Sequence, residues 1–177
     1  MKLTRWIVAW LIVCTAALAS SAQGTVPHAE LDKYSAHAQQ NDVSIGATLL
    51  TVGHVRKVFH TDVNKCCVVV EVAIYPQKDH PTEVWLNDFA LRLVGQDTGA
   101  KPSSPRVVAW NSSHDSDRLR PMLIADMEQE VGERSLPLGS TAAPVSGYLY
   151  FSLEKAKHAK HQLEYTLNGN KVTLALD

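Results

Sequence analysis

The sequence predicts a mainly β fold, a β-sandwich with short accessory helices. Residues 66–75 are β-branched and apolar almost without interruption, which indicates a buried strand. Residues 89–94 alternate between large apolar and smaller or charged side chains, which indicates a strand with one buried face. Asn168-Gly169 separates two further alternating runs and is the strongest two-residue hairpin signal. We expect 66–75 and 89–94 to be neighbouring strands of one sheet.

The N-terminus has the pattern of a secretory signal peptide over residues 1–22. Lys2 and Arg5 precede an apolar run over 7–19 that is too short to span a bilayer comfortably, and the small residues 20–22 suit signal peptidase. Removing this segment lowers Lys+Arg from 17 to 15 against 18 acidic residues, so the mature chain is mildly acidic. We therefore expect a secreted or periplasmic protein with no nucleic-acid partner and no transmembrane segment in the mature chain.

Residues 23–42 are polar, and we predict a flexible leader there, followed by a single domain over 43–177. Residues 43–50 are apolar enough for a first strand. Thr51 has the side chain of a helix N-cap, and apolar residues follow it at helical spacing, which predicts a short helix over 52–60.

Two more helices are predicted in the middle of the chain. Ser104-Pro105 is a favourable helix start, and the helix should run to Trp110. Apolar residues recur every fourth position from 118 to 131, which predicts a second helix. The alternative there is a strand with three residues pointing inward: Leu123, Ala125 and Met127.

The C-terminal third predicts three strands, over 147–153, 163–167 and 172–176, with a polar loop at 154–161. The inward members of all the alternating runs should form the core. They are Val68, Val70, Val72, Ile74, Phe89, Leu91, Leu93, Leu149, Phe151, Leu163, Tyr165, Val172 and Leu174. Glu71 has the opposite phase, so we expect it on an exposed outer face.

Several segments together resemble a known group of proteins: 68–76, 88–93, 136–140, 145–151 and 163–165. They are similar to the bacterial secreted immunoglobulin-like β-sandwiches of unassigned function that are grouped with extracellular immunoprotective antigens. The resemblance implies an immunoglobulin-like β-sandwich over 43–177, an export route, and a binding or envelope role. That family carries no catalytic motif.

Export, a nearly balanced charge and the lack of a catalytic motif favour a non-catalytic interaction domain whose partner is an unknown envelope or extracellular protein. No cofactor is predicted. A hydrolase or metal-dependent enzyme would have to collect groups from scattered loops. The candidates for that alternative are His54, His60, Asp79, His80, His114 and Asp115. A structural envelope component is the third hypothesis.

Several local patterns can be explained by ordinary solvent-exposed structure without a functional site. Ser113-His114-Asp115 cannot form a triad, because adjacent side chains do not converge, and a solvated loop is favoured. Asp126 and Glu130 fit a solvated helix face. The basic loop is best explained as a solvated loop between two strands. Its lysines repel cations and disfavour a metal, so the functional alternative is weak contact with an anion or an acidic partner. Its residues are Lys155, Lys157, His158, Lys160 and His161. An aromatic sugar-binding patch requires both Trp85 and Trp110 to face solvent.

Cys66 and Cys67 are the only cysteines beyond the signal segment. Their Cα atoms must lie about 3.8 Å apart, whereas a relaxed disulfide needs about 4.4–6.8 Å, so we expect them to stay unbridged. The strand phase places Cys66 in the core and Cys67 on the outer face. Two inert thiols are the simpler interpretation. The alternative is that Cys67 pairs with another chain and gives a disulfide-linked homodimer.

Overall fold

Antiparallel pairing organises the strands of the computed structural model, which describes residues 23–113, 121–152 and 159–176. The larger sheet has the order β1-β2-β3-β7, the smaller one β5-β8-β9, and β4 pairs with β6. The strands are β1 (Ala36–Gln40), β2 (Val43–Leu49), β3 (Val68–Pro76), β4 (Thr82–Val84), β5 (Phe89–Leu93), β6 (Gly139–Thr141), β7 (Val145–Phe151), β8 (His161–Leu167) and β9 (Asn170–Leu176). The mainly β prediction is confirmed.

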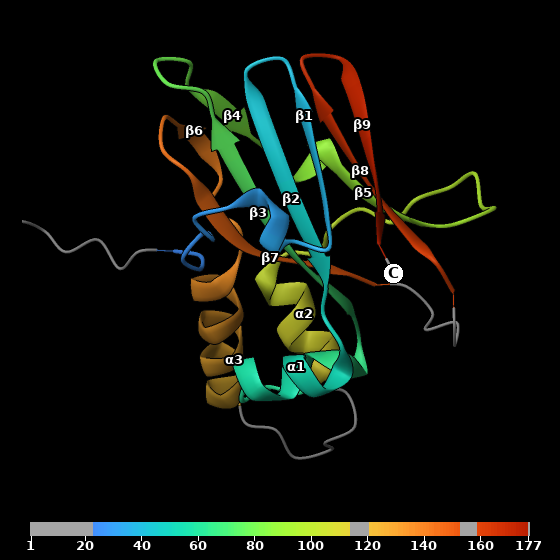
Figure 1. The fold of residues 1–177 in the computed structure, drawn as a ribbon. Coiled ribbons are helices and arrows are strands. Elements are labelled where there is room, and N and C mark those ends of the chain that lie inside the picture. Colours follow the sequence, from blue (N-terminus) through green and yellow to red (C-terminus); the bar gives the residue numbers. More distant parts are fainter. Residues whose placement is uncertain (1–22, 114–120, 153–158, 177) are drawn as a thin grey trace, which may run out of the picture.

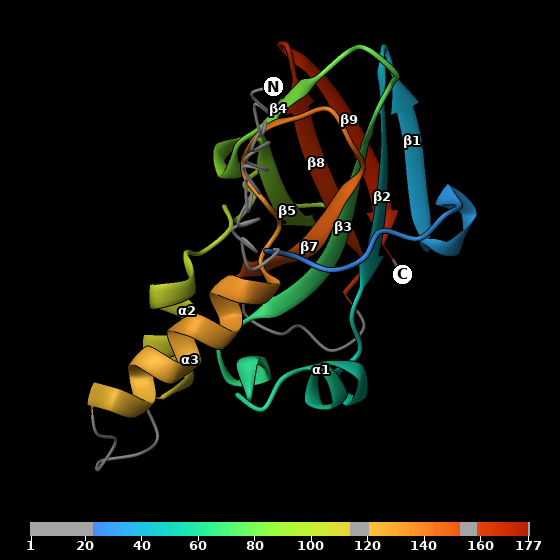
Figure 2. The ribbon, with the colours of Figure 1, turned by 90° about the vertical axis from the view of Figure 1, so that its left-hand side faces the viewer.

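The two larger sheets pack face to face (Figure 2), and their inner faces share one apolar cluster that we call the sheet core. Every predicted core residue is buried except Val68 and Leu93, which are half-buried at the ends of their strands. Asn168 (φ 50°) and Gly169 (φ 79°) form the predicted hairpin between β8 and β9, because both adopt the left-handed backbone that the tight turn needs.

The prediction that residues 66–75 and 89–94 are neighbouring strands is wrong. β3 pairs with β2 and β7, whereas β5 pairs with β8 in the smaller sheet. Both segments do have a buried face, and those faces meet across the sheet core. Alternation in a sequence shows which face of a strand is buried, but it does not identify the hydrogen-bonded neighbour.

Three α-helices gather at one end of the sheets (Figure 1): α1 (Val52–Val58), α2 (Pro105–Ser112) and α3 (Pro121–Arg134). Thr51 caps α1 as predicted, since its hydroxyl accepts a hydrogen bond of 3.2 Å from the amide of His54. The predicted helix over 118–131 is confirmed in its described part, and the strand alternative is wrong. The short 3₁₀ turns are η1 (Leu31–Lys33), η2 (Val63–Lys65) and η3 (Leu86–Asp88).

The helices create a second apolar cluster, which we call the helix core, against the outer face of β3 and β7. Its members are Leu50, Val55, Phe59, Val63, Cys67, Val69, Val108, Val131, Tyr148 and Tyr150. β3 is therefore covered on both faces near its start, where Val69 is as fully buried as Val70. This explains why the run over 66–75 is so continuously apolar.

Residues 23–42 were predicted to be a flexible leader, and the structure contradicts this for most of the segment. Residues 36–40 form β1, which pairs along its whole length with β2. Tyr34 is 3% exposed and packs where Gly46 lacks a side chain. The amide of Thr25 donates a hydrogen bond of 2.8 Å to Ser146 O on β7. The polar composition was misleading because β1 is an edge strand whose side chains are at most half-buried, so the strand needs few large apolar residues.

Candidate binding cleft

An open cleft of about 770 Å³ lies beside α3, next to the helix core. The turn between α1 and η2 and the end of α2 form its other walls. Its lining residues are Gly24, His60, Thr61, Asp62, Lys65, Ser112, Ser113, Leu123, Asp126, Met127, Glu130, Glu133 and Arg134. The lining mixes both signs of charge with the apolar side chains of Leu123 and Met127, so it can contact a mixed polar and apolar partner surface.

Phe59 fixes the chain at the point where it enters the cleft. It follows the last residue of α1, and its ring lies edge-on to Tyr148 at 5.3 Å and to Tyr150 at 6.0 Å. The Arg134 guanidinium lies 5.6 Å from the Phe59 ring centroid on the cleft side. Because Phe59 is 4% exposed and packed in this way, the next two residues, His60 and Thr61, must face α3.

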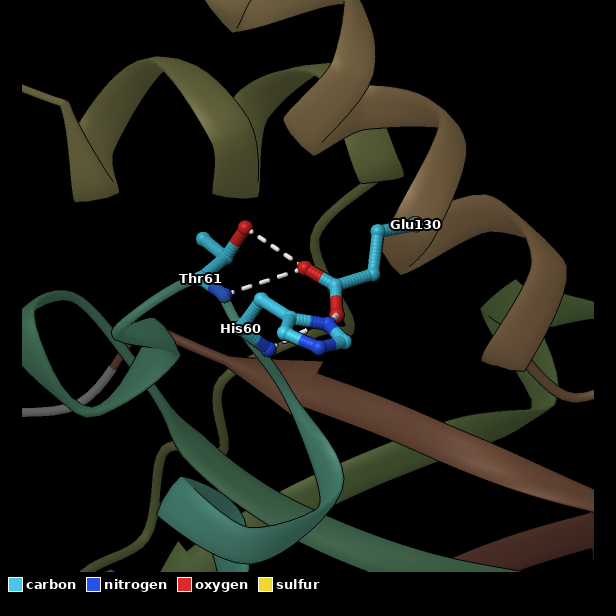
Figure 3. A network of polar contacts seen from close by, with 3 residues as sticks. All are labelled: His60, Thr61 and Glu130. Carbon is cyan, nitrogen blue, oxygen red and sulfur yellow. Dashed lines mark hydrogen bonds and ion pairs between the residues drawn. The ribbon is translucent and has the colours of Figure 1, made fainter.

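Glu130 of α3 accepts four hydrogen bonds from this turn (Figure 3). Its Oε1 accepts from the His60 amide at 2.7 Å and from His60 Nδ1 at 3.0 Å. Its Oε2 accepts from the Thr61 amide at 3.0 Å and from Thr61 Oγ1 at 2.7 Å. Both carboxylate oxygens are thus occupied by groups about 70 residues away in sequence.

The hydrogen bonds also control the charge of Glu130. Partial burial acts to raise the pKa of this carboxyl, but the bonds from His60 and Thr61 outweigh burial, and the pKa is lowered from its ordinary value of 4.5. Glu130 therefore stays ionised and serves as a fixed acceptor that joins α3 to the turn. The prediction that it belongs to a solvated helix face is wrong, because its side chain is only 16% exposed.

The side chain of His60, unlike that of Glu130, is almost fully exposed to solvent. Its side chain is 96% exposed, and Nδ1 is the ring nitrogen that bonds to the carboxylate. The Nδ1 proton goes to Glu130 (Figure 3), and the rest of the ring belongs to an almost fully exposed side chain in the lining of the cleft. Such a ring can donate to or accept from a bound group, and Asp126 and Glu133 add exposed carboxylates on the same wall.

The other residues of the enzyme hypothesis do not join this site. His80 Nδ1 lies 3.4 Å from Asp42 Oδ2, and together with Asp79 they line a separate small cavity of about 200 Å³. His54 is exposed on α1. His114 and Asp115 lie outside the described residues. Within residues 23–113, 121–152 and 159–176, no three His, Cys, Asp or Glu side chains gather in a way that could hold a metal ion.

Cys66 and Cys67 are joined by a disulfide, so the prediction that they stay unbridged is wrong. Their predicted burial is also reversed, because Cys67 is 1% exposed in the helix core and Cys66 is half-buried. The pair precedes β3, and Cys66 has a helical backbone after η2, so the alternation of a strand does not apply there. In this state Cys67 has no thiol to offer another chain.

The basic loop is described only in part. Lys155, Lys157 and His158 lie outside the described residues. Lys160 is exposed, but His161 is the first residue of β8, and burial lowers the pKa of its imidazole. Anion contact through His161 is therefore disfavoured, because its charged form is harder to reach.

The two tryptophans of the aromatic hypothesis both reach solvent. Trp85 is 55% exposed and Trp110 is 56% exposed. Trp85 lies between β4 and η3, whereas Trp110 lies on α2 and lines a second groove between α2 and α3. They belong to different elements and different surroundings, so exposure alone does not make them one patch.

The amino-acid sequence did not identify Glu130 or Thr61 as site residues. A glutamate on a polar helix face has no local signal that separates a solvated carboxylate from one that binds a distant turn. The chemistry depends on α3 crossing the turn after α1, and only the fold supplies that contact.

No protein-family model matches this sequence, and no curated protein matches it significantly. A solved structure that is similar is the crystal structure of a candidate lipoprotein, ycdA, from Bacillus subtilis subsp. subtilis str. 168. The identity is 19%, the match covers 80% of this chain and 38% of that one, and the TM-score is 0.45. This chain spans well under half the length of that protein, and we infer neither family nor function from the likeness.

Proposed function

We propose that this protein is an exported, non-catalytic interaction domain of the cell envelope or extracellular space. Its scaffold is an immunoglobulin-like β-sandwich, and the cleft beside α3 is its binding surface. The signal-peptide pattern of residues 1–22 supports export. Among the helices of residues 23–113, 121–152 and 159–176, none is long and apolar enough to cross a membrane.

The observation that carries this proposal is how Glu130 is used. In a catalytic site we expect a carboxylate to have an oxygen available to substrate or to a proton. Both oxygens of Glu130 are instead saturated by the fold, which makes the wall of the cleft rigid. A preformed wall lowers the entropy cost of binding, so the arrangement suits recognition better than turnover.

Site-directed photo-crosslinking tests the proposal. A photoreactive residue replaces Leu123, which is 44% exposed in the cleft, and the mature protein is irradiated in its native envelope. A matched variant carries the same residue at Val94, which is 53% exposed just after β5. We expect a discrete adduct with one partner from position 123 only, weakened by Glu130→Gln in the same chain. Equal labelling from both positions would contradict the cleft as binding surface.

The crosslinking experiment also distinguishes a binding domain from a structural envelope component. A structural component would give a ladder of adducts with copies of this chain. The enzyme hypothesis retains one favourable observation, the His60 ring held by a carboxylate as a general base often is. Hydrolysis of ester or amide substrates by the purified protein, lost in His60→Ala but kept in His54→Ala, would favour that alternative.

A further inference from the structure

The Cys66–Cys67 disulfide stands at the junction between η2 and β3, where the helix core meets the cleft. Cys67 is 1% exposed inside the helix core. Cys66 is half-buried, and its Sγ lies 3.4 Å from Ser112 Oγ at the end of α2. Ser112 and Lys65, the residue before the pair, both line the cleft. The disulfide therefore touches the two elements that form the wall opposite α3.

We propose that Cys66 and Cys67 form a dithiol–disulfide switch that sets the position of this wall, made by η2 and the end of α2. In the oxidised state the ring closed by the disulfide restricts the backbone torsions of both residues, so η2 is tied to the start of β3. Reduction opens the ring and lets Cys66 move independently of Cys67. The inference relies on the proposed function only in treating the cleft as the binding surface.

The reductant is a dithiol, such as the paired thiols of a thiol–disulfide oxidoreductase. One of its thiolates attacks Cys66 Sγ, the sulfur of the less buried residue, and the Cys67 sulfur leaves as a thiolate that takes up a proton. The second thiol of the reductant then attacks the mixed disulfide and releases the Cys66 thiol. The reductant ends as a disulfide, and the chain ends with two S–H groups, so two electrons and two protons are transferred.

The surroundings of Cys66 give the reduced state contacts that the oxidised state lacks. A disulfide sulfur has no proton to donate, yet Cys66 Sγ lies 3.5 Å from Val63 O and 3.8 Å from Val108 O. Val63 O already accepts the amides of Cys66 at 3.3 Å and Cys67 at 3.1 Å. A thiol at Cys66 would donate either to Val63 O, which changes the hydrogen bonding within η2, or to Val108 O, which adds a bond between the end of η2 and α2.

The experiment uses the mature protein without any ligand. Amide NMR spectra are recorded before and after reduction with dithiothreitol, and alkylation followed by mass spectrometry of the peptide that contains both cysteines measures the fraction reduced. We expect the amide peaks of Asp62, Lys65, Ser112 and Ser113 to shift on reduction. Peaks of Val172 and Leu174 on β9 should stay in place and serve as the internal control.

A double variant, Cys66→Ser with Cys67→Ala, has no bridge but keeps an O–H donor at position 66, so it should place the cleft amides near the reduced positions and should not respond to dithiothreitol. If the peptide is fully reduced while the cleft amides do not move, the coupling is wrong. If the exported protein already contains two free thiols in oxidising buffer, the bridge itself is wrong. Neither result concerns the partner, so they can be told apart from a failure of the crosslinking experiment.

Discussion

The sheet core and the helix core share β3 and β7, but they are held together differently. The sheet core lies between two hydrogen-bonded sheets and is made of aliphatic and aromatic side chains. The helix core is smaller, and specific hydrogen bonds hold its elements together. Glu130 accepts from the turn after α1, and the hydroxyl of buried Tyr150 donates to Val131 O at 3.1 Å. The helix core also borders the cleft and contains Cys67.

The sheet core and the helix core should therefore respond differently to substitution. Apolar burial and backbone ladders make the sheet core tolerant of changes in polar side chains, because few polar groups take part in it. The helix core depends on a few specific hydrogen bonds, so single polar substitutions should loosen it locally. We therefore expect binding and redox events to act on the helix core, with the sheet core as a rigid support.

The largest effect is expected when a charged side chain is introduced into each core in turn. Leu91 and Val131 are both 0% exposed, in the sheet core and the helix core respectively. Leu91→Asp places an unpaired carboxylate between the sheets at a cost of several kcal/mol, comparable to the whole stability of a domain at about 5–15 kcal/mol. Near-ultraviolet circular dichroism should show complete loss of tertiary structure. Val131→Asp should instead remove amide-exchange protection from the helices and leave the sheets protected. Equal unfolding in both would mean one cooperative unit.

A pair of phenylalanines gives the next largest effect. Phe89 stacks on Tyr165 at 4.7 Å in the sheet core, and Phe59 lies edge-on to Tyr148 in the helix core. Either change to alanine should cost about 3–5 kcal/mol, measured by urea denaturation. We expect Phe89→Ala to shift a single transition, and Phe59→Ala to release His60 first and broaden or split the transition. Two single transitions of unchanged slope would contradict the division between the cores.

Glu130→Gln should destabilise the protein by about 1–3 kcal/mol, since the amide replaces an ionised acceptor of four hydrogen bonds. Glu133→Gln is the matched control, because the Glu133 side chain is exposed on the same helix and accepts one hydrogen bond of 2.8 Å, from Gln129 Nε2. The lowered pKa of Glu130 means that its contribution is present above pH 4.5 and is lost as the pH falls below that value. The wild type and Glu130→Gln should converge in acid, while Glu133→Gln stays close to the wild type throughout.

The sequence predicted the sheet core well because its signals are local. Alternation identified Leu91 and Leu174 as buried, and Asn168-Gly169 identified the hairpin. The helix caps at Thr51 and Ser104 were predictable for the same reason, since the capping hydroxyl bonds to an amide three residues away. Strand partners were not predictable, because pairing depends on the order in which strands cross between the sheets.

The candidate site was mostly unpredictable because its contacts are long-range. Glu130 and Thr61 meet only after α3 packs beside the turn, and nothing near either residue encodes the other. Cys67 shares the helix core with Val69, so it does lie on the outer face of β3, but the helices cover that face and bury it. Cys66 precedes the strand, which begins at Val68, and its helical backbone takes it out of the alternation. The alternation of a strand gives its phase, but it does not show which of its faces other elements cover.

The smallest expected effect concerns Glu71, which is the counterpart of Glu130 on the outer face of the larger sheet. It lies opposite Tyr148 on β7, on the predicted outer face, but it is half-buried, so the prediction of an exposed position is wrong. Burial raises the pKa of its carboxyl from 4.5, and the opposing charges of His28 and His54 offset this only in part. The two carboxylates therefore respond to pH in opposite directions.

Because the folded state binds the Glu71 proton more tightly than the unfolded chain does, the stabilisation from this residue is present below pH 4.5 and is lost as the pH rises through the folded pKa. Glu71→Gln removes this dependence. We expect the variant to be slightly more stable than the wild type at neutral pH, by less than about 1 kcal/mol, and the advantage to disappear in acid. Urea denaturation from about pH 3 to about pH 7 measures both slopes. A variant that is less stable than the wild type at neutral pH would show that attraction to His28 and His54 exceeds the cost of burying the ionised carboxylate.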